Sequence, residues 1–121
     1  MLVAVATAPV PVGVDVERRV PFERLADLRW ALSEDERCEV TDLHWARLTE
    51  IWTAKEAAGK AAGTGLGGHP ASVRTQPGTR ADTRTATITT SNGDLCFEIA
   101  GMWCGDHHLS VATPGARNGS I

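Results

Sequence analysis

The sequence predicts a single α+β domain in which a small, mostly antiparallel sheet packs on one long helix. Residues 12–17 alternate apolar and polar side chains, as a half-buried strand does. Residues 45–62 repeat apolar side chains at helical spacing. Towards the C-terminus, two β-prone segments flank Asn92-Gly93, a dipeptide typical of tight hairpin turns. A long helix combined with a hairpin and further strands indicates the α+β class.

Four elements are expected before the long helix. They are a strand at Leu2–Ala6, a strand at Val12–Glu17, a short helix at Phe22–Leu28 and a helix from Glu34 into the early forties. Pro9 and Pro11 separate the two strands, because proline cannot donate to a strand ladder. Ser33 and Glu36 form a capping-box pattern, which predicts where the fourth element begins.

The segment after the long helix is expected to begin as a loop and to end as a sheet. The helix should end at Gly63. Thr64–Arg84 has four glycines, two prolines and little apolar content, which predicts a long, exposed and flexible loop. Three strands should follow, at Thr85–Ser91, Leu95–Ala100 and His108–Thr113. We expect one domain over residues 1–113 and a disordered tail over 114–121.

Composition argues against several classes of protein. The 121 residues carry a formal net charge of -3, so the chain lacks the basic excess of a general nucleic-acid binder. The longest apolar stretch, Met1–Val14, contains two prolines and no cationic leader, so we expect neither a transmembrane helix nor a secretory signal. A cytoplasmic protein with no nucleic-acid or membrane partner is therefore expected.

Cysteine usage agrees with a reducing compartment. Cys38, Cys96 and Cys104 are odd in number and widely spaced, unlike the paired cysteines of a small secreted domain. The last two could form a zinc site with His107 and His108. We favour the simpler interpretation of buried thiols beside surface imidazoles.

Asp15 and Glu17 are the first candidate site. In a strand, their side chains point to the face opposite Val14 and Val16 and lie about 7 Å apart at the backbone. Two carboxylates at this spacing can converge on one hard divalent cation. The alternative is a half-buried strand with a solvated acidic face.

The second candidate site is one face of the long helix. At about 100° per residue, five side chains fall within roughly 140° of arc. They are Trp52, Lys55, Glu56, Gly59 and Lys60. The alternative is an exposed helix on which Glu56 and Lys60 form a weak ion pair. However, ten of the twelve basic residues are arginines and both lysines lie on this face, where a compact ammonium group suits a phosphate contact beside a metal ion.

These residues belong to three ordered motifs that resemble those of the 4'-phosphopantetheinyl transferases, particularly the surfactin-synthetase-activating type. The motifs are PVGVDVE at 11–17, LSEDE at 32–36 and WTAKEAAGKAAGTGL at 52–66. His108–Ala112 is similar to the closing strand of the family. The resemblance covers most of residues 2–66 together with that strand, and it includes the spacing between the motifs.

The resemblance implies an enzyme with this family's α+β fold. Such an enzyme uses magnesium to transfer the phosphopantetheine arm of coenzyme A to a serine of an acyl, polyketide or peptidyl carrier protein. Asp15, Glu17 and Glu56 match the family's metal-binding acids. Lys60 matches the phosphate-contacting lysine and Lys55 the other motif lysine, so both are candidate coenzyme A contacts. Glu56 is also the candidate proton acceptor, with Lys60 as the second catalytic residue.

The chain differs from the surfactin-type enzymes in length, because those enzymes consist of two similar halves. The short holo-acyl-carrier-protein synthases instead form trimers with sites between neighbours. We therefore expect a homo-oligomer, with a trimer favoured, in which a neighbour binds the 3'-phosphate and adenine. Its candidate donors are His107, His108, Arg74, Arg80 and Arg84. The alternative is a non-catalytic or partner-dependent domain, such as a half enzyme, a binding subunit or a piece of a larger synthase.

A carrier-protein partner implies a basic patch on this acidic chain. Carrier proteins are acidic around their target serine, and four arginines follow the acidic strand closely. They are Arg18, Arg19, Arg24 and Arg29. We expect them to contact the carrier protein, whereas the alternative is a solvated helix face.

Overall fold

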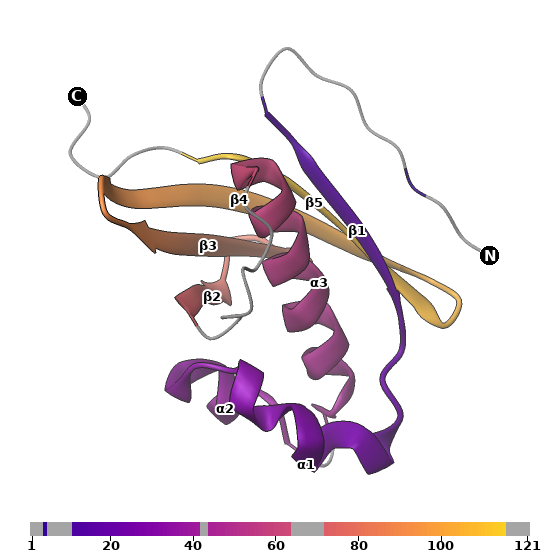
Figure 1. The fold of residues 1–121 in the computed structure, drawn as a ribbon. Helices are drawn as coiled ribbons and strands as arrows, with labels where there is room; N and C mark the ends of the chain where they lie inside the picture. The colour runs from indigo at the N-terminus through magenta and orange to yellow at the C-terminus, as the bar shows by residue number, and fades with distance from the viewer. Residues whose placement is uncertain (1–3, 5–10, 42–43, 64–71, 116–121) are drawn as a thin grey trace.

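The computed structural model describes residues 4, 11–41, 44–63 and 72–115. Five strands in these ranges form one antiparallel sheet in the order β1-β5-β4-β3-β2. The strands are Gly13–Arg18 (β1), Val73–Pro77 (β2), Thr83–Thr90 (β3), Gly93–Cys104 (β4) and His107–Pro114 (β5). One long helix, Ala46–Ala62 (α3), crosses one face of the sheet (Figure 1). The α+β class predicted from the sequence is confirmed.

Short helical elements gather at the N-terminal end of α3 (Figure 1). They are Phe22–Arg24 (η1), Leu25–Leu28 (α1), Arg29–Ala31 (η2) and Glu34–Glu39 (α2). At the start of α2, the Glu36 amide donates to the Ser33 hydroxyl at 3.3 Å, and the Ser33 amide donates to the Glu36 carboxylate at 2.8 Å. The predicted capping box is thus formed, although α2 ends at Glu39, before the early forties.

Two local signals mark their elements correctly. The long helix ends at Gly63, whose φ of 77° lies in the left-handed region that favours glycine. The hairpin predicted around Asn92-Gly93 is confirmed, because β3 and β4 pair from Thr83 opposite Ala100 to Thr90 opposite Gly93.

All of the described helices are too short or too polar to cross a membrane.

The loop predicted over residues 64–84 is wrong in its second half. Residues 73–77 form β2 and Thr83 begins β3. The buried side chains here are partly polar: the Thr75 hydroxyl donates to the Glu36 carboxylate at 2.6 Å, and Arg84 donates to both oxygens of Glu39 at 2.8 Å. Such partners come from α2, so residues 72–84 lack the apolar alternation that marks a strand in sequence.

Three of the predicted segments fall on residues whose structure is not described. The strand expected at Leu2–Ala6 lies outside the described residues, apart from Ala4. The first part of the expected loop, at 64–71, and residues 116–121 of the tail expected over 114–121 also lie outside them. The tail begins later than predicted, because Pro114 ends β5 and the Gly115 amide donates to the Cys96 carbonyl at 2.9 Å.

The core has two parts along α3. The C-terminal half of the helix presents mainly alanines to the sheet, where they pack on Phe97, Ile99 and Val73. The N-terminal half presents Leu48 and Ile51 to the short helical elements. Small side chains let the sheet approach closely at the end of the helix that carries the candidate site.

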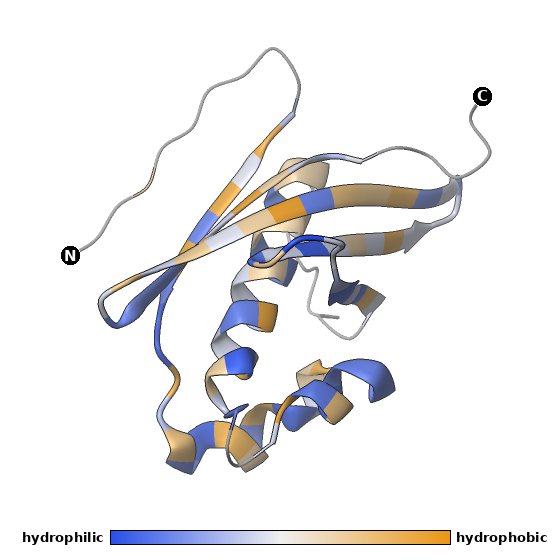
Figure 2. Cartoon of the chain, turned by 180° about the vertical axis from the view of Figure 1, so that it is seen from behind, coloured by the Kyte–Doolittle hydropathy of each residue, from blue (hydrophilic) through white to orange (hydrophobic). Residues whose placement is uncertain are grey.

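The second face of the sheet carries apolar side chains that α3 does not cover. Along the strands, hydrophobic and hydrophilic residues alternate, as Figure 2 shows from behind. The apolar residues on the uncovered face of β1, β5 and β4 are Val14, Val16, Leu109, Val111, Ala100 and Met102. Met102 is 55% exposed, whereas most of the others are half-buried. This surface is called the open face below.

Candidate active site

The acidic face of β1 is turned towards α3. Asp15 is only 7% exposed, and Glu17 is half-buried on the same side of the strand. Gly13 makes this approach possible, because a Cβ at that position would lie 1.9 Å from the Ala57 carbonyl oxygen. The predicted alternation of β1 is confirmed, but its acidic face packs against the helix, which excludes the alternative of a solvated acidic face.

Asp15 and Lys60 form the central contact of this site. The Lys60 ammonium group donates to Asp15 Oδ1 at 2.9 Å and to the Val14 carbonyl at 3.2 Å. Asp15 Oδ2 is buried and has no hydrogen-bond partner among the described residues. A buried carboxylate oxygen without a partner is costly, so the position calls for a donor or a cation.

The carboxyl groups of Glu17 and Glu56 both have raised pKa values, and the Asp15 carboxylate contributes to both shifts. Burial and the neighbouring Asp15 carboxylate raise the pKa of Glu17 to about 7. Burial and Asp15 also raise the pKa of Glu56, while Lys60 partly offsets them. Lys60 in turn has a raised pKa because it donates to Asp15, so it stays protonated. Three carboxylates and one ammonium group leave an excess of negative charge here.

The carboxylates of Asp15, Glu17 and Glu56 lie near one another, but they do not converge on a single metal position. Among the described residues, no three His, Cys, Asp or Glu side chains stand close enough together to hold a metal ion. The acids therefore form an open cluster, which we call the acidic cluster: Asp15, Glu17 and Glu56. A cation entering it would draw the carboxylates together and relieve their mutual repulsion.

The prediction that one face of α3 presents the ammonium groups of both Lys55 and Lys60 is wrong. The Lys55 side chain is fully buried, and its ammonium group lies 2.7 Å from Glu36 and donates to the Ala31 carbonyl at 2.9 Å. Burial disfavours the charged Glu36 carboxylate, but hydrogen bonds from Lys55 and Thr75 outweigh this and lower its pKa. The helix turns Lys55 towards α2, whereas the Lys60 side chain is 51% exposed. In this arrangement the Lys55 ammonium group faces Glu36 and the Ala31 carbonyl, away from solvent.

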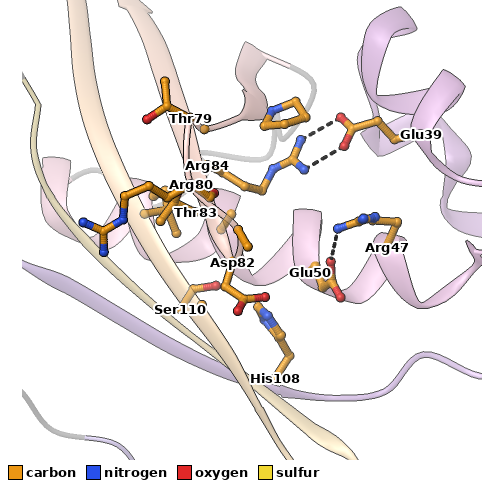
Figure 3. A pocket seen from close by; sticks show the side chains of 16 residues that line it. Glu39, Arg47, Glu50, Thr79, Arg80, Asp82, Thr83, Arg84, His108 and Ser110 are labelled. Carbon is orange, nitrogen blue, oxygen red and sulfur yellow. Dashed lines mark hydrogen bonds and ion pairs between the residues drawn. The ribbon is translucent and has the colours of Figure 1, made fainter.

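A separate cavity of about 360 Å³ lies between the N-terminal half of α3 and the β2–β3 connection (Figure 3). Ion pairs between Arg84 and Glu39 and between Arg47 and Glu50 line one side of it, as Figure 3 shows. His108 and Ser110 reach the same cavity from β5. The acidic residues of β1 do not line it, so the cavity is distinct from the acidic cluster.

A comparison with protein-family models covers both the sheet and the acidic cluster. A family model described as the 4'-phosphopantetheinyl transferase superfamily matches residues 11–112 of the 121-residue chain. The chain belongs to this superfamily. The match runs from the start of the acidic strand to the closing strand, so it includes every residue of the acidic cluster. A comparison with curated proteins found no match.

The superfamily generally uses coenzyme A and a divalent metal ion, and the acidic cluster of this transferase-family chain fits such an ion. The unpartnered Asp15 Oδ2 is a free ligand atom, and the two glutamates supply further oxygens. Magnesium prefers oxygen ligands and binds through only one or two carboxylates, keeping several waters. The residues present therefore fit a hard divalent ion held through one or two carboxylates, and they do not form the closed cage that a zinc site needs.

The structure brings three of the four candidate carrier-contact arginines together. Arg18, Arg19 and Arg24 line one depression of about 490 Å³, and all three are exposed. The Arg19 guanidinium lies 4.3 Å from the centre of the Trp45 ring, a cation–π contact that fixes its position. Arg29 is exposed but lines a separate, smaller depression.

Two of the donors expected to cross a subunit interface are not free to do so. His108 is 6% exposed and Arg84 is 8% exposed, and Arg84 donates to both carboxylate oxygens of Glu39. Both residues point towards α3 because they lie on the covered face of the sheet. Arg74, Arg80 and His107 keep more exposure.

Sequence reasoning gave no role to two residues that shape the site. Gly13 allows β1 to touch α3, and Thr53 hydrogen-bonds to β5. Both stand inside the resemblance motifs, but their roles depend on which strand lies behind the helix. That pairing is not encoded in any local pattern.

Proposed function

We propose that this chain transfers the 4'-phosphopantetheine arm of coenzyme A to a serine of an acyl, polyketide or peptidyl carrier protein, with magnesium as the metal ion. The observation that carries the proposal is the buried, unpartnered Asp15 Oδ2 beside Lys60. Superfamily membership supplies the reaction class. The acidic cluster offers ligands for a divalent cation, which would in turn bind the pyrophosphate oxygens of coenzyme A.

Lys60 is proposed to contact that pyrophosphate. Its ammonium group has three N–H donors, and Asp15 Oδ1 and the Val14 carbonyl occupy two of them. The side chain is 51% exposed, so the third donor is accessible to a phosphate oxygen. A bound magnesium ion would neutralise the charge that develops on the departing phosphate.

Glu56 is proposed to take the proton of the carrier serine. Its raised pKa makes it a stronger base than an ordinary glutamate, and it is only half-buried. The serine oxygen forms a bond to the phosphorus that bears the pantetheine arm, and the bond from that phosphorus to the bridging oxygen breaks. The proton passes to Glu56, and adenosine 3',5'-bisphosphate leaves with the bridging oxygen.

The carrier protein and further copies of the chain complete the proposal. Arg18, Arg19 and Arg24 offer a cationic surface to an acidic carrier, and Arg29 adds an exposed positive charge in a neighbouring, separate depression. We also propose that copies of the chain form a homo-oligomer, with a trimer favoured, because the open face exposes apolar side chains on three adjacent strands. Light scattering tests this, and a fully active monomer would contradict it.

The direct test is mass spectrometry of apo carrier proteins incubated with the chain, coenzyme A and magnesium. Addition of the phosphopantetheine arm to the carrier serine supports the proposal. Lys60→Ala should reduce this transfer strongly, and Lys60→Arg should restore only part of it, because a planar guanidinium does not reproduce a compact charge. Calorimetry then tests the alternative of a non-catalytic domain: metal-dependent binding of coenzyme A without transfer would favour a binding subunit.

A further inference from the structure

Thr53 joins α3 to β5, the strand that pairs with the acid-bearing strand β1. Its hydroxyl oxygen lies 2.6 Å from Nδ1 of His108 and accepts a hydrogen bond from the Ser110 hydroxyl at 2.8 Å. It also donates to the Glu50 carbonyl at 3.0 Å. Thr53 and Ser110 are fully buried and His108 nearly so, which strengthens these hydrogen bonds and makes any unpaired member costly.

The donors and acceptors of this group can all be satisfied together. The Thr53 hydroxyl donates its one proton to the Glu50 carbonyl and accepts from both β5 side chains. His108 then carries its proton on Nδ1, and we assign this tautomer from the hydrogen-bond pattern. One threonine oxygen thus holds two residues of β5 against α3.

The two residues that Thr53 holds are the strand partners of the two acids on β1. Ser110 lies opposite Asp15 and His108 lies opposite Glu17 in the β1–β5 register. Figure 1 shows β1 running beside β5 with α3 across them, and Figure 3 shows the two β5 side chains side by side. Any shift of β5 relative to α3 therefore moves the two acids of β1 as well.

The third acid follows Thr53 on the helix itself. Glu56 comes three residues later in α3, on the next turn. The hydrogen bonds of Thr53 consequently connect the strand pair that carries Asp15 and Glu17 to the helix that carries Glu56. Lys60 ties α3 to β1 directly, through Asp15 and the Val14 carbonyl, whereas Thr53 ties the helix to β5, the strand that pairs with β1.

We propose that Thr53 is a positioning residue that sets the separation between the β1 acids and Glu56 for the binding of a divalent cation. This inference rests on the proposed function, because it assigns a purpose to the acidic cluster. Magnesium requires near-ideal octahedral geometry with short oxygen bonds. A small displacement of β1 from α3 is therefore enough to weaken its binding.

The test compares three variants of the full chain. Thr53→Val keeps the shape of the side chain and removes the hydroxyl, whereas Thr53→Ser keeps the hydroxyl. Thr49→Val is the matched control: Thr49 is a buried threonine one turn earlier in α3, and its hydroxyl accepts from the Val20 amide and not from β5. Calorimetry with magnesium chloride and manganese chloride measures metal affinity, thermal unfolding measures stability, and steady-state assays separate kcat from KM.

Thr53→Val should weaken metal binding by about tenfold, the lower end of what outer-sphere changes at metal sites cause. It should lower kcat with little change in the KM for the carrier protein. Thr53→Ser should restore most of the affinity, and Thr49→Val should lose stability while keeping metal affinity. If Thr53→Val does not fold, Ser110→Ala removes one of the two β5 contacts and should give a smaller loss of metal affinity.

The outcomes separate this inference from the proposed function. Wild-type affinity in Thr53→Val, or an equal loss of affinity in Thr49→Val, would overturn the positioning role alone. A wild-type chain that binds no divalent metal and modifies no carrier protein would overturn the proposed function, and the positioning role with it.

Discussion

Asp15 and Lys60, 45 residues apart in the chain, are joined by an ion pair of 2.9 Å that occupies only one oxygen of the carboxylate. The other oxygen, Oδ2, is buried without a hydrogen-bond partner among the described residues. The ion pair fixes the orientation of Asp15 while leaving one ligand position unsatisfied. Burial and Asp15 raise the pKa of Glu17 to about 7, so a protonated Glu17 can donate to Asp15 in the absence of metal, and a divalent cation can take the place of that proton.

The first prediction concerns metal-linked stability. Magnesium at about a hundred times its dissociation constant should raise the free energy of unfolding by about 2.7 kcal/mol, because it binds the folded chain alone. Asp15→Asn should remove most of this gain, since the amide cannot supply a charged ligand oxygen. Thermal unfolding with and without magnesium measures the effect. An Asp15→Asn chain that magnesium stabilises as much as wild type would contradict the assignment.

The second prediction concerns pH in the absence of metal. Glu17 has its pKa raised from the ordinary 4.5 to about 7 by burial and by Asp15, so the folded chain holds this proton to higher pH than the unfolded chain does. Its contribution to the free energy of unfolding is therefore fully present below about pH 4.5 and is lost as pH rises through about 7. Glu17→Gln should remove this dependence.

The measurement must be a difference between wild type and Glu17→Gln, because His108 acts in the opposite direction. Burial lowers the pKa of His108, so the unfolded chain binds its proton more readily below about pH 6.5 and stability rises with pH there. Urea unfolding of both chains from pH 5 to pH 8 isolates the Glu17 contribution. Glu98→Gln, at an exposed position on β4, serves as the control. A constant difference across this range would refute the prediction.

Elements with a local signal could be predicted from sequence. The capping box at Ser33 and Glu36, the stop at Gly63 and the turn at Asn92-Gly93 act within a few residues, so their patterns are visible in the chain. β2 had no such signal. Its buried Thr75 bonds to Glu36, 39 residues earlier, and only the folded chain shows that partner.

The candidate site could be predicted in its residue types but only partly in its geometry. Helical spacing placed Lys55 and Lys60 on one face, because it treats the helix as isolated. In the folded chain α2 lies against one edge of that face and offers Glu36, so Lys55 is buried and Lys60 is not. Similarly, the alternation of β1 located Asp15 correctly but could not show which face of the strand meets α3.

The third prediction concerns the buried Lys55–Glu36 pair. Lys55→Met or Glu36→Gln should each lower the free energy of unfolding by about 3 to 5 kcal/mol, because each leaves an uncompensated buried group. The double variant should lose less than the sum of the two, since neither charge is then stranded. Urea unfolding measures all three.

The same variants test whether Lys55 contacts coenzyme A. A fully buried ammonium group should not, so folded Lys55→Met should bind coenzyme A with wild-type affinity, whereas Lys60→Ala should not. Calorimetry at a temperature where all chains are folded makes the comparison. Equal losses of coenzyme A affinity in the two variants would show that Lys55 does contribute to coenzyme A binding.

The last prediction concerns the carrier surface. Arg24 and Arg29 are exposed residues of the short helical elements, and Arg24 has only a weak pairing with Asp27 at 3.8 Å. Reversing both to Glu should raise the KM for the carrier protein several-fold. Negative charges at the edge of the proposed interface repel an acidic carrier protein and slow its association with the chain. The KM for coenzyme A should not change, since neither residue belongs to the acidic cluster.

A matched control removes the contribution of net charge. Arg37 and Arg47 are exposed residues on α2 and α3, outside the depression formed by Arg18, Arg19 and Arg24 and not among the candidate coenzyme A donors. Reversing this pair changes the net charge by the same amount, so it should leave the carrier KM close to wild type if the contact is local. Adding salt should narrow the difference between wild type and the Arg24/Arg29 variant, because exposed charges are screened. Equal effects of the two reversals on the carrier KM would show that the chain attracts its partner through net charge and that these arginines make no specific contact.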